Sequence, residues 1–210
     1  MRAVRTRQPQ AVYNQCVRPG LRPPRNFQRL QRTGDAPLAQ PCLIELPAPD
    51  DTDRLGRDFA LALLAASSGI ARRGLALRLE GNLGAGKTSF VRATLRALGW
   101  QGAVKSPTFT LLETYPLEGF TLNHFDFYRF ETPEEFDDAG FGEEFGPGRV
   151  CCTEWSGRAE PFLPPADLTL ALAHEGAGRR AALSAASPLG EEILRTMTER
   201  SASWKQAAAV

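Results

Sequence analysis

The segment Gly81-Asn82-Leu83-Gly84-Ala85-Gly86-Lys87-Thr88 constrains the fold of this 210-residue chain more than any other feature. It matches the pattern G-x-x-x-x-G-K-[ST] of a phosphate-binding loop. Glycines let the backbone turn so that successive N–H groups point inward at phosphate oxygens. A helix that begins at the lysine directs its positive end to the same place. The segment therefore predicts a strand before it and a helix after it.

Hydrophobic patterning on both sides of the loop agrees with that arrangement. A strand is predicted over Leu75–Glu80, and a helix over Thr88–Leu98 that Gly99 ends. Further strands are predicted over Cys42–Leu46, Phe109–Tyr115, Thr121–Asp126, Arg149–Glu154, Leu168–Ala173 and Arg180–Ala185. Further helices are predicted from Asp50 to Gly69, after Pro133, and from Glu191 to Gln206. This order predicts an α/β fold: a three-layer P-loop NTPase-like domain with a mostly parallel central sheet.

The first forty residues differ in composition from the rest. Eight arginines and no acidic residue lie between Met1 and Gly34, although the net charge of the whole chain is only +1. The prolines among them break any amphipathic helix, which disfavours an organelle transit peptide. We therefore expect residues 1–40 to be a basic, disordered extension and residues 41–206 to be a P-loop ATPase domain. A misassigned start codon is the alternative explanation of the extension.

Other features of the composition concern location. No run of apolar residues is long enough to span a membrane, and the near-zero net charge implies no general attraction to nucleic acid or membranes. The spacing of Cys16, Cys42, Cys151 and Cys152 matches no zinc motif. Buried free thiols in a reducing cytosol are favoured over a redox pair. We expect a cytoplasmic protein that contacts no membrane.

The phosphate-binding loop predicts ATP and Mg²⁺ as ligands. Lys87 is expected to bring its charge to the β and γ phosphates, and the Thr88 hydroxyl to bind Mg²⁺. The expected nucleotide contacts are Leu83, Gly84, Ala85, Gly86, Lys87, Thr88 and Ser89. None of the three lysines fits the guanine-reading motif N/T-K-x-D, so ATP rather than GTP is predicted.

Two acidic residues end predicted strands at the edge where nucleotides bind in such folds. Asp126 and Glu154 are both candidates to hold the Mg²⁺ shell or to orient the attacking water, and the pattern leaves the choice open. His124 is either a general base or a buried, hydrogen-bonded side chain. Trp155 packs either beside the nucleotide or in the core. The segment Lys105–Thr110 lies where switch loops of P-loop hydrolases occur, with a plain turn as the alternative.

The motifs taken together resemble a known family. GNLGAGKTSFVRATLRALG, KSPTFTLLETY, HFDFYRF and TEW occur in this order, as in the TsaE (YjeE) family, the small bacterial ATPases required for threonylcarbamoyladenosine in tRNA. The resemblance extends from about Leu43 to Ala185. It implies that Lys87 binds phosphate, that Thr88 and Glu154 bind Mg²⁺, and that Asp126 acts in hydrolysis. It also implies that Thr52 lies near the nucleotide and Arg179 near the base.

The resemblance further implies partners. The family works with a TsaD-like threonylcarbamoyl transferase and its TsaB-like paralogue, so contact with tRNA is expected only indirectly. Its ATP cycle resets that complex. Asn82 departs from the more usual Asp in the loop, with little effect expected because the position contributes mainly backbone. The extension at residues 1–40 has no counterpart.

Two other functions use a phosphate-binding loop. One is a small-molecule kinase, and the other is a nucleotide-gated scaffold without enzymatic activity whose basic extension binds RNA. The segment Glu131–Gly148 is rich in acids and would repel an anionic acceptor, which disfavours the kinase. We expect Glu131–Glu144 to be a docking face for a protein partner.

Overall fold

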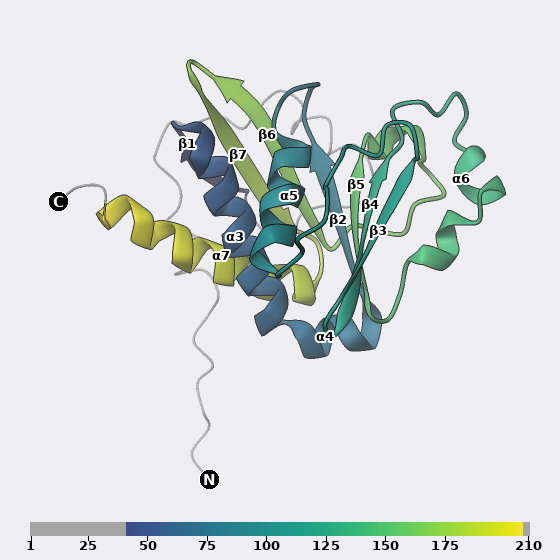
Figure 1. The fold of residues 1–210 in the computed structure, drawn as a ribbon, viewed down its shortest axis with the longest axis horizontal. Coiled ribbons are helices and arrows are strands. Elements are labelled where there is room, and N and C mark those ends of the chain that lie inside the picture. The colour runs from purple at the N-terminus through teal and green to yellow at the C-terminus, as the bar shows by residue number, and fades with distance from the viewer. Residues whose placement is uncertain (1–40, 208–210) are drawn as a thin grey trace, which may run out of the picture.

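The computed structural model describes residues 41–207, with side chains to residue 200. The predicted extension at residues 1–40 lies outside this range. One sheet of seven strands runs in the order β1-β7-β6-β2-β5-β4-β3 (Figure 1). The strands are β1 (Cys42–Leu46), β2 (Leu75–Glu80), β3 (Leu112–Leu117), β4 (Phe120–Asp126), β5 (Arg149–Glu154), β6 (Leu168–Glu175) and β7 (Gly178–Ala185). All seven predicted strands are therefore present.

The sheet is parallel at its centre. Strands β6, β2, β5 and β4 run in the same direction. The pairs β1–β7, β7–β6 and β4–β3 at the two edges are antiparallel. This arrangement confirms the predicted α/β fold with a mostly parallel central sheet. It also brings the carboxyl ends of β2, β4 and β5 to one edge, where ligands bind in open α/β sheets.

Long helices cover one face of the sheet. They are α3 (Pro49–Ala65), α5 (Lys87–Ala97) and α7 (Pro188–Ala207), and they lie in front of the sheet in Figure 1. Their apolar side chains join those of β1, β2 and β5 in the main hydrophobic core. Burial of this apolar surface is the main stabilising contribution of the layer.

The opposite face is covered by shorter segments. The elements there are α6 (Glu135–Asp138) and the 3₁₀ helices η1 (Phe141–Glu144) and η2 (Ser156–Arg158). A second apolar cluster fills this layer and consists of Phe125, Phe127, Phe130, Phe136, Cys151, Ala159 and Leu163. The third layer of the domain is thus built mainly from loops and aromatic side chains.

A close contact between two helices places α5 and the loop before it. A Cβ at Gly56 in α3 would lie 2.7 Å from the carbonyl oxygen of Phe90 and 2.8 Å from Ala93 Cβ in α5. Only glycine permits this approach. Thr94 reinforces the contact, because its hydroxyl donates to the Gly56 carbonyl over 3.1 Å. The interface fixes α5, whose first residue is Lys87.

Three predicted elements have a boundary that differs from the structure by three residues or more. One is the closing helix, which begins at Pro188 rather than at Glu191. The helix predicted from Asp50 to Gly69 is divided at Ala66, and α4 (Ser67–Arg73) continues past Gly69 to Gly74, whose φ of 75° ends it. The strand predicted from Phe109 begins only at Leu112, because residues 108–110 form a turn and Leu111 has a φ of 64°. The sequence of this turn has strand propensity, but its hydroxyl groups bind elsewhere, as described below.

Among residues 41–207, no helix has the length and apolarity needed to cross a bilayer. Cys42, Cys151 and Cys152 are buried, and Cys151 and Cys152 are free thiols, as the sequence predicts. Burial raises the pKa of the Cys151 thiol to about 12. Cys16 lies outside the described residues.

Candidate active site at the carboxyl edge of the sheet

The loop between β2 and α5 has the backbone that its glycines predict. Gly81, Gly84 and Gly86 have φ values of 143°, 78° and 108°, in a region that other residues rarely adopt. A Cβ at Gly81 would lie 2.4 Å from the carbonyl oxygen of Leu172, so the loop packs directly on β6. Leu83, at the tip, is 88% exposed.

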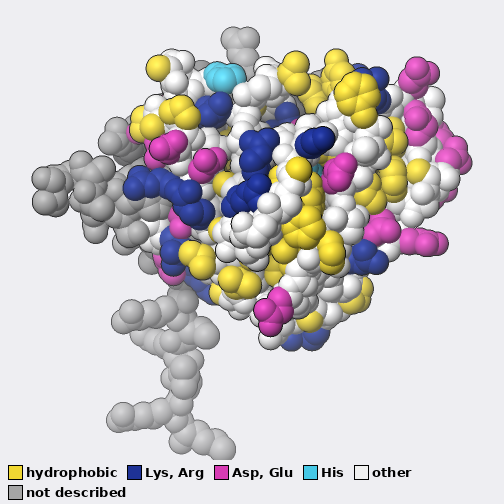
Figure 2. Space-filling model, in the orientation of Figure 1, with side chains coloured by type: hydrophobic (Ala, Val, Ile, Leu, Met, Phe, Trp, Pro, Cys, Tyr) yellow, Lys and Arg dark blue, Asp and Glu magenta, His cyan; other side chains and the backbone are white. Residues whose placement is uncertain are grey.

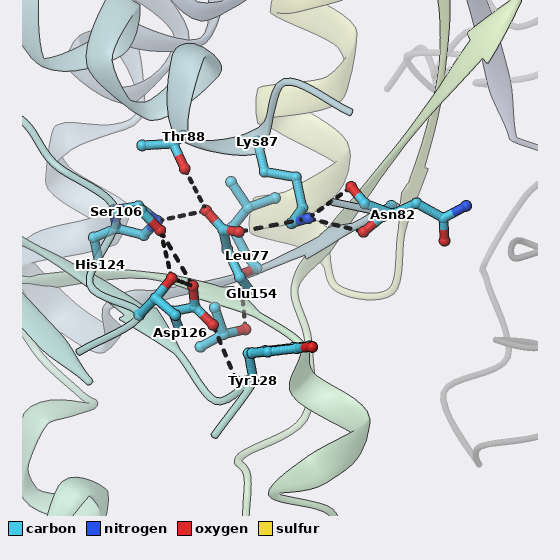
Figure 3. Close-up of polar contacts among 12 residues, drawn as sticks. Leu77, Asn82, Lys87, Thr88, Ser106, His124, Asp126, Tyr128 and Glu154 are labelled. Atoms are coloured by element: carbon cyan, nitrogen blue, oxygen red, sulfur yellow. Dashed lines mark hydrogen bonds and ion pairs between the residues drawn. The ribbon is translucent and has the colours of Figure 1, made fainter. Parts of the chain in front are cut away.

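The Lys87 side chain folds back over this loop (Figure 3). Its Nζ donates to the carbonyl oxygens of Gly81, at 2.8 Å, and Asn82, at 3.2 Å. Nζ also lies 3.5 Å from Oε2 of Glu154 and 5.1 Å from the centre of the Trp155 ring. The ammonium group is therefore buried, held by neutral carbonyls and one carboxylate, and placed at the loop.

Glu154, the last residue of β5, connects the phosphate-binding loop to β4. Its Oε1 accepts hydrogen bonds from the Thr88 hydroxyl, at 3.1 Å, and from Nε2 of His124, at 3.0 Å. Burial raises the pKa of this carboxyl. The hydrogen bond and charge of His124, the charge of Lys87 and the Thr88 hydroxyl outweigh burial, so the net pKa is below its usual 4.5. Glu154 is therefore an ionised carboxylate at neutral pH.

Asp126, the last residue of β4, is the register partner of Glu154 but has different neighbours. Its Oδ2 accepts from the hydroxyls of Ser106, at 3.2 Å, and Thr108, at 2.5 Å. Its Oδ1 accepts from the backbone N–H of Tyr128 at 3.0 Å. Both oxygens of Asp126 thus hold protein donors, and two of these come from the predicted switch segment.

Thr52 and Arg179 meet beside the phosphate-binding loop, on the side away from Asp126. Arg179 Nη1 donates to the Thr52 hydroxyl over 3.4 Å. A Cβ at Gly86 would lie 3.3 Å from Arg179 Nε and 3.5 Å from Thr52 Cγ2. Arg179 Nε is buried and has no acceptor among the described residues, so it is a donor available to a ligand at this loop.

Aromatic and cationic side chains continue from Trp155 toward the switch segment. The Trp155 and Tyr128 rings are 5.0 Å apart, and the Arg158 guanidinium is 5.6 Å from the Tyr128 ring. The Arg129 guanidinium lies 4.1 Å above the ring of Phe109, which is 82% exposed. Trp155 thus contacts Lys87 on one side and Tyr128 on the other, beside the phosphate-binding loop.

The acidic docking face predicted over Glu131–Glu144 lies at one end of the molecule. Asp and Glu side chains gather there, at the end that α6 occupies (Figure 2). Its last residue is tied to the sheet, because Asn123 Nδ2 donates to Glu144 Oε2 over 3.0 Å and Arg149 pairs with it at 2.7 Å. The face is exposed, and no described contact tests its docking role.

Most of the predicted site residues therefore converge. The structure joins Lys87, Thr88, Glu154, Trp155 and Asp126 at one edge, with Thr52 and Arg179 beside Gly86. Ala85 is buried beneath the loop, Gly84 is exposed, and Ser89 is half-buried in the first turn of α5. Sequence reasoning left the partner of His124 open. The alternation of side chains along β4 could have helped to find it. His124 and Asp126 lie two residues apart, so both point to the face of the sheet that α5 covers.

The side chains present fit a magnesium ion with bound nucleotide. Mg²⁺ binds proteins through one or two oxygen ligands and completes its shell with water and phosphate. Thr88 Oγ1 and Glu154 Oε1, 3.1 Å apart, are oxygens of this kind next to the phosphate-binding loop. Among the described residues no cluster of three His, Cys, Asp or Glu forms a separate metal centre.

The chain is similar to known proteins in sequence and in fold. The family model described as "Threonylcarbamoyl adenosine biosynthesis protein TsaE" matches residues 46–182. The Haemophilus influenzae tRNA threonylcarbamoyladenosine biosynthesis protein TsaE is 38% identical over 67% of this chain and 87% of its own. The Bacillus subtilis protein of that name is 39% identical over 58% of this chain and 74% of its own length. The crystal structure of Bacillus subtilis YdiB superposes with a TM-score of 0.59 and 25% identity, covering 77% of this chain and 96% of YdiB.

Proposed function

The chain belongs to the TsaE family of tRNA threonylcarbamoyladenosine biosynthesis proteins, and we propose that it binds and hydrolyses ATP with Mg²⁺ in that process. The observation that carries the proposal is the convergence of Lys87, Thr88 and Glu154 on one phosphate-binding loop. A cation, a hydroxyl and an ionised carboxylate in this position are the groups that a Mg-nucleotide requires.

Nucleotide binding uses groups of the phosphate-binding loop, some of which contact other parts of the chain in this structure. The N–H groups of the loop and the start of α5 receive the phosphates, and Lys87 exchanges the carbonyls of Gly81 and Asn82 for phosphate oxygens. Arg179 and Thr52 contact the nucleotide on the other side of Gly86. Thr88 and Glu154 would hold Mg²⁺, which neutralises phosphate charge when bound.

Asp126 serves hydrolysis by a different route. Because its two oxygens accept from Ser106, Thr108 and Tyr128, it anchors the segment at residues 106–110 as a switch loop. The loop thereby stays next to the strand end that carries Glu154. Asp126 thus acts on the attacking water through the position of this loop.

The proposed partners are a TsaD-like threonylcarbamoyl transferase and its TsaB-like paralogue, met in the cytoplasm. The acidic face at Glu131–Glu144 is the proposed docking surface because it is largely exposed and begins two residues after Arg129 in the chain. Arg129 rests on Phe109 of the switch loop, so a partner that moves this loop also moves Arg129. We therefore expect slow hydrolysis by the chain alone and a changed rate with the partners.

Two measurements test the activity. Calorimetry measures ATP affinity with and without Mg²⁺, and phosphate release over many turnovers measures hydrolysis with and without the partner proteins. Multiple turnovers without an acceptor indicate an ATPase, whereas release that requires a small-molecule acceptor indicates a kinase. Tight ATP binding without turnover under all conditions would favour a nucleotide-gated scaffold and would overturn the enzymatic proposal.

A further inference from the structure

His124 is fully buried and makes one polar contact of a specific kind. Its side chain has 0% exposure, and Nε2 lies 3.0 Å from Glu154 Oε1. Because an ionised carboxylate only accepts, Nε2 carries the proton and donates it. The other ring nitrogen, Nδ1, is buried with no protein partner in the described part of the chain. The imidazole therefore directs its polar contact toward Glu154.

The oxygen that His124 holds is the one that meets Thr88. Glu154 Oε1 accepts from both side chains, over 3.0 and 3.1 Å. His124 approaches from β4 and Thr88 from α5, so the carboxylate is fixed between two elements (Figure 3). An apolar residue would fill the same volume without fixing this oxygen.

Lys87 competes for the same carboxylate. Its Nζ is 3.5 Å from the other oxygen, Oε2, a separation longer than a good charge-assisted hydrogen bond. A carboxylate released from His124 is free to turn toward Lys87. A closer Lys87–Glu154 pair would withdraw the cation from the phosphates and the oxygen from Thr88.

We propose that His124 is a positioning residue that holds the Glu154 carboxylate next to Thr88 and away from Lys87. Thr88 Oγ1 and Glu154 Oε1 then stay side by side, in position to bind Mg²⁺. This inference rests on the proposed Mg-ATP function. Residues that orient metal ligands typically change metal affinity about 10–100-fold when they are replaced. We expect an effect of this size on the Mg²⁺ requirement.

The experiment compares variants that keep or remove the donor. In His124→Gln the side-chain amide reaches the position of Nε2, whereas His124→Leu fills the space without a donor, and His124→Asn directs its amide to the position of Nδ1. A fluorescent ATP analogue is titrated at a series of Mg²⁺ concentrations and also in EDTA, and the thermal unfolding midpoint is recorded for each protein. The measured quantity is the Mg²⁺ concentration at half-maximal binding enhancement.

The expected half-maximal Mg²⁺ concentration rises about 10–100-fold in His124→Leu and His124→Asn and returns to within a few-fold of the parent in His124→Gln. Asn123→Leu is the matched control, because Asn123 is the adjacent buried polar residue and binds Glu144 instead. It should lower the unfolding midpoint without changing the Mg²⁺ requirement.

The outcomes separate this inference from the proposed function. If the parent protein binds the analogue equally well with and without Mg²⁺, the proposed Mg-ATP function fails. If the parent requires Mg²⁺ and a folded His124→Leu or His124→Asn variant has the parental requirement, the positioning role is wrong. Should one of these two fail to fold, the other gives the same decision, and loss of the Mg²⁺ response in His124→Gln would also contradict the role.

Discussion

Glu154 and Asp126 are paired in the sheet, yet their surroundings differ. They end adjacent parallel strands and face each other in register. Glu154 contacts the Lys87 ammonium, the Thr88 hydroxyl and the His124 ring, all near the phosphate-binding loop. Asp126 contacts two hydroxyls of the switch loop and one backbone N–H. Two carboxylates on one edge thus contact different groups: Glu154 contacts the phosphate-binding loop and His124, and Asp126 contacts the switch loop.

The largest expected effect is the loss of ATP affinity when Lys87 is replaced, because its ammonium group contacts both the phosphate-binding loop and Glu154. Lys87→Ala should weaken ATP binding about 100-fold or more, because it removes a charge-assisted contact to phosphate and leaves Glu154 to repel it. Calorimetry measures the affinity, and circular dichroism checks that the fold is retained. Unchanged affinity in Lys87→Ala would contradict the phosphate-binding assignment of this loop.

The two acids should separate in their metal dependence. Glu154→Gln should raise the Mg²⁺ concentration needed for ATP binding about 10–100-fold, because the amide is a weaker metal ligand. Asp126→Asn should leave that concentration unchanged and slow hydrolysis about 100-fold. Phosphate release measured over a Mg²⁺ series in the presence of partners distinguishes them. If the required Mg²⁺ concentration rises equally in both variants, the proposed difference in metal dependence between Glu154 and Asp126 is wrong.

The anchoring role of Asp126 predicts coupling to the switch loop. Removal of both hydroxyls, in Ser106→Ala with Thr108→Val, should slow hydrolysis about as much as Asp126→Asn, and adding Asp126→Asn should cost little more. The mutant cycle compares the hydrolysis rates of four proteins: the parent, the variant without the two hydroxyls, Asp126→Asn, and the variant with all three changes. Thr110→Val is the control, since its hydroxyl donates to Glu113 rather than to Asp126. Additive losses in the cycle would mean that Asp126 acts without the loop.

The smallest effect concerns pH. The pKa of Glu154 is lower in the folded protein than its usual 4.5, so its ionised form stabilises the fold. This stability is present above the usual pKa and is lost as pH falls through the lower folded value. Glu154→Gln lacks it, so the stability difference between parent and variant should be largest at neutral pH and shrink below pH 4.5. Urea unfolding across this range measures the difference, and a constant difference would contradict the shift.

The sequence predicted one part of this site better than the other. The local sequence of the loop Gly81–Thr88 is enough to predict its conformation, because the glycine spacing determines the turn and the lysine begins the helix. The course of residues 106–111 was not predictable in this way. Phe109-Thr110-Leu111 has strand propensity, but two hydroxyls bind a carboxylate eighteen and twenty residues later, and the strand begins at Leu112. Such long-range contacts are absent from local patterns.

The pairing of Glu154 with His124 was also beyond local reasoning. Each lies on its own strand, and only the parallel register of β4 and β5 brings them together. The break of the first helix at Ala66 likewise depends on packing, because no proline lies between Asp50 and Gly74 to end the helix there. All seven strands and the three long helices were nevertheless predicted, since apolar periodicity is strong in each of them, whereas α4 as a separate helix and the 3₁₀ helices η1 and η2 were not predicted.

Complementation tests most directly whether this chain acts as a Mg-ATPase in threonylcarbamoyladenosine formation. Bacteria depleted of their own TsaE protein receive the parent chain or Lys87→Ala, and the modified nucleoside in their tRNA is measured by mass spectrometry. We expect the parent chain to restore threonylcarbamoyladenosine, whereas Lys87→Ala, expressed at the same level, should not restore it. Absence of the modification with a soluble, ATP-binding parent chain, or full restoration by Lys87→Ala, would contradict it.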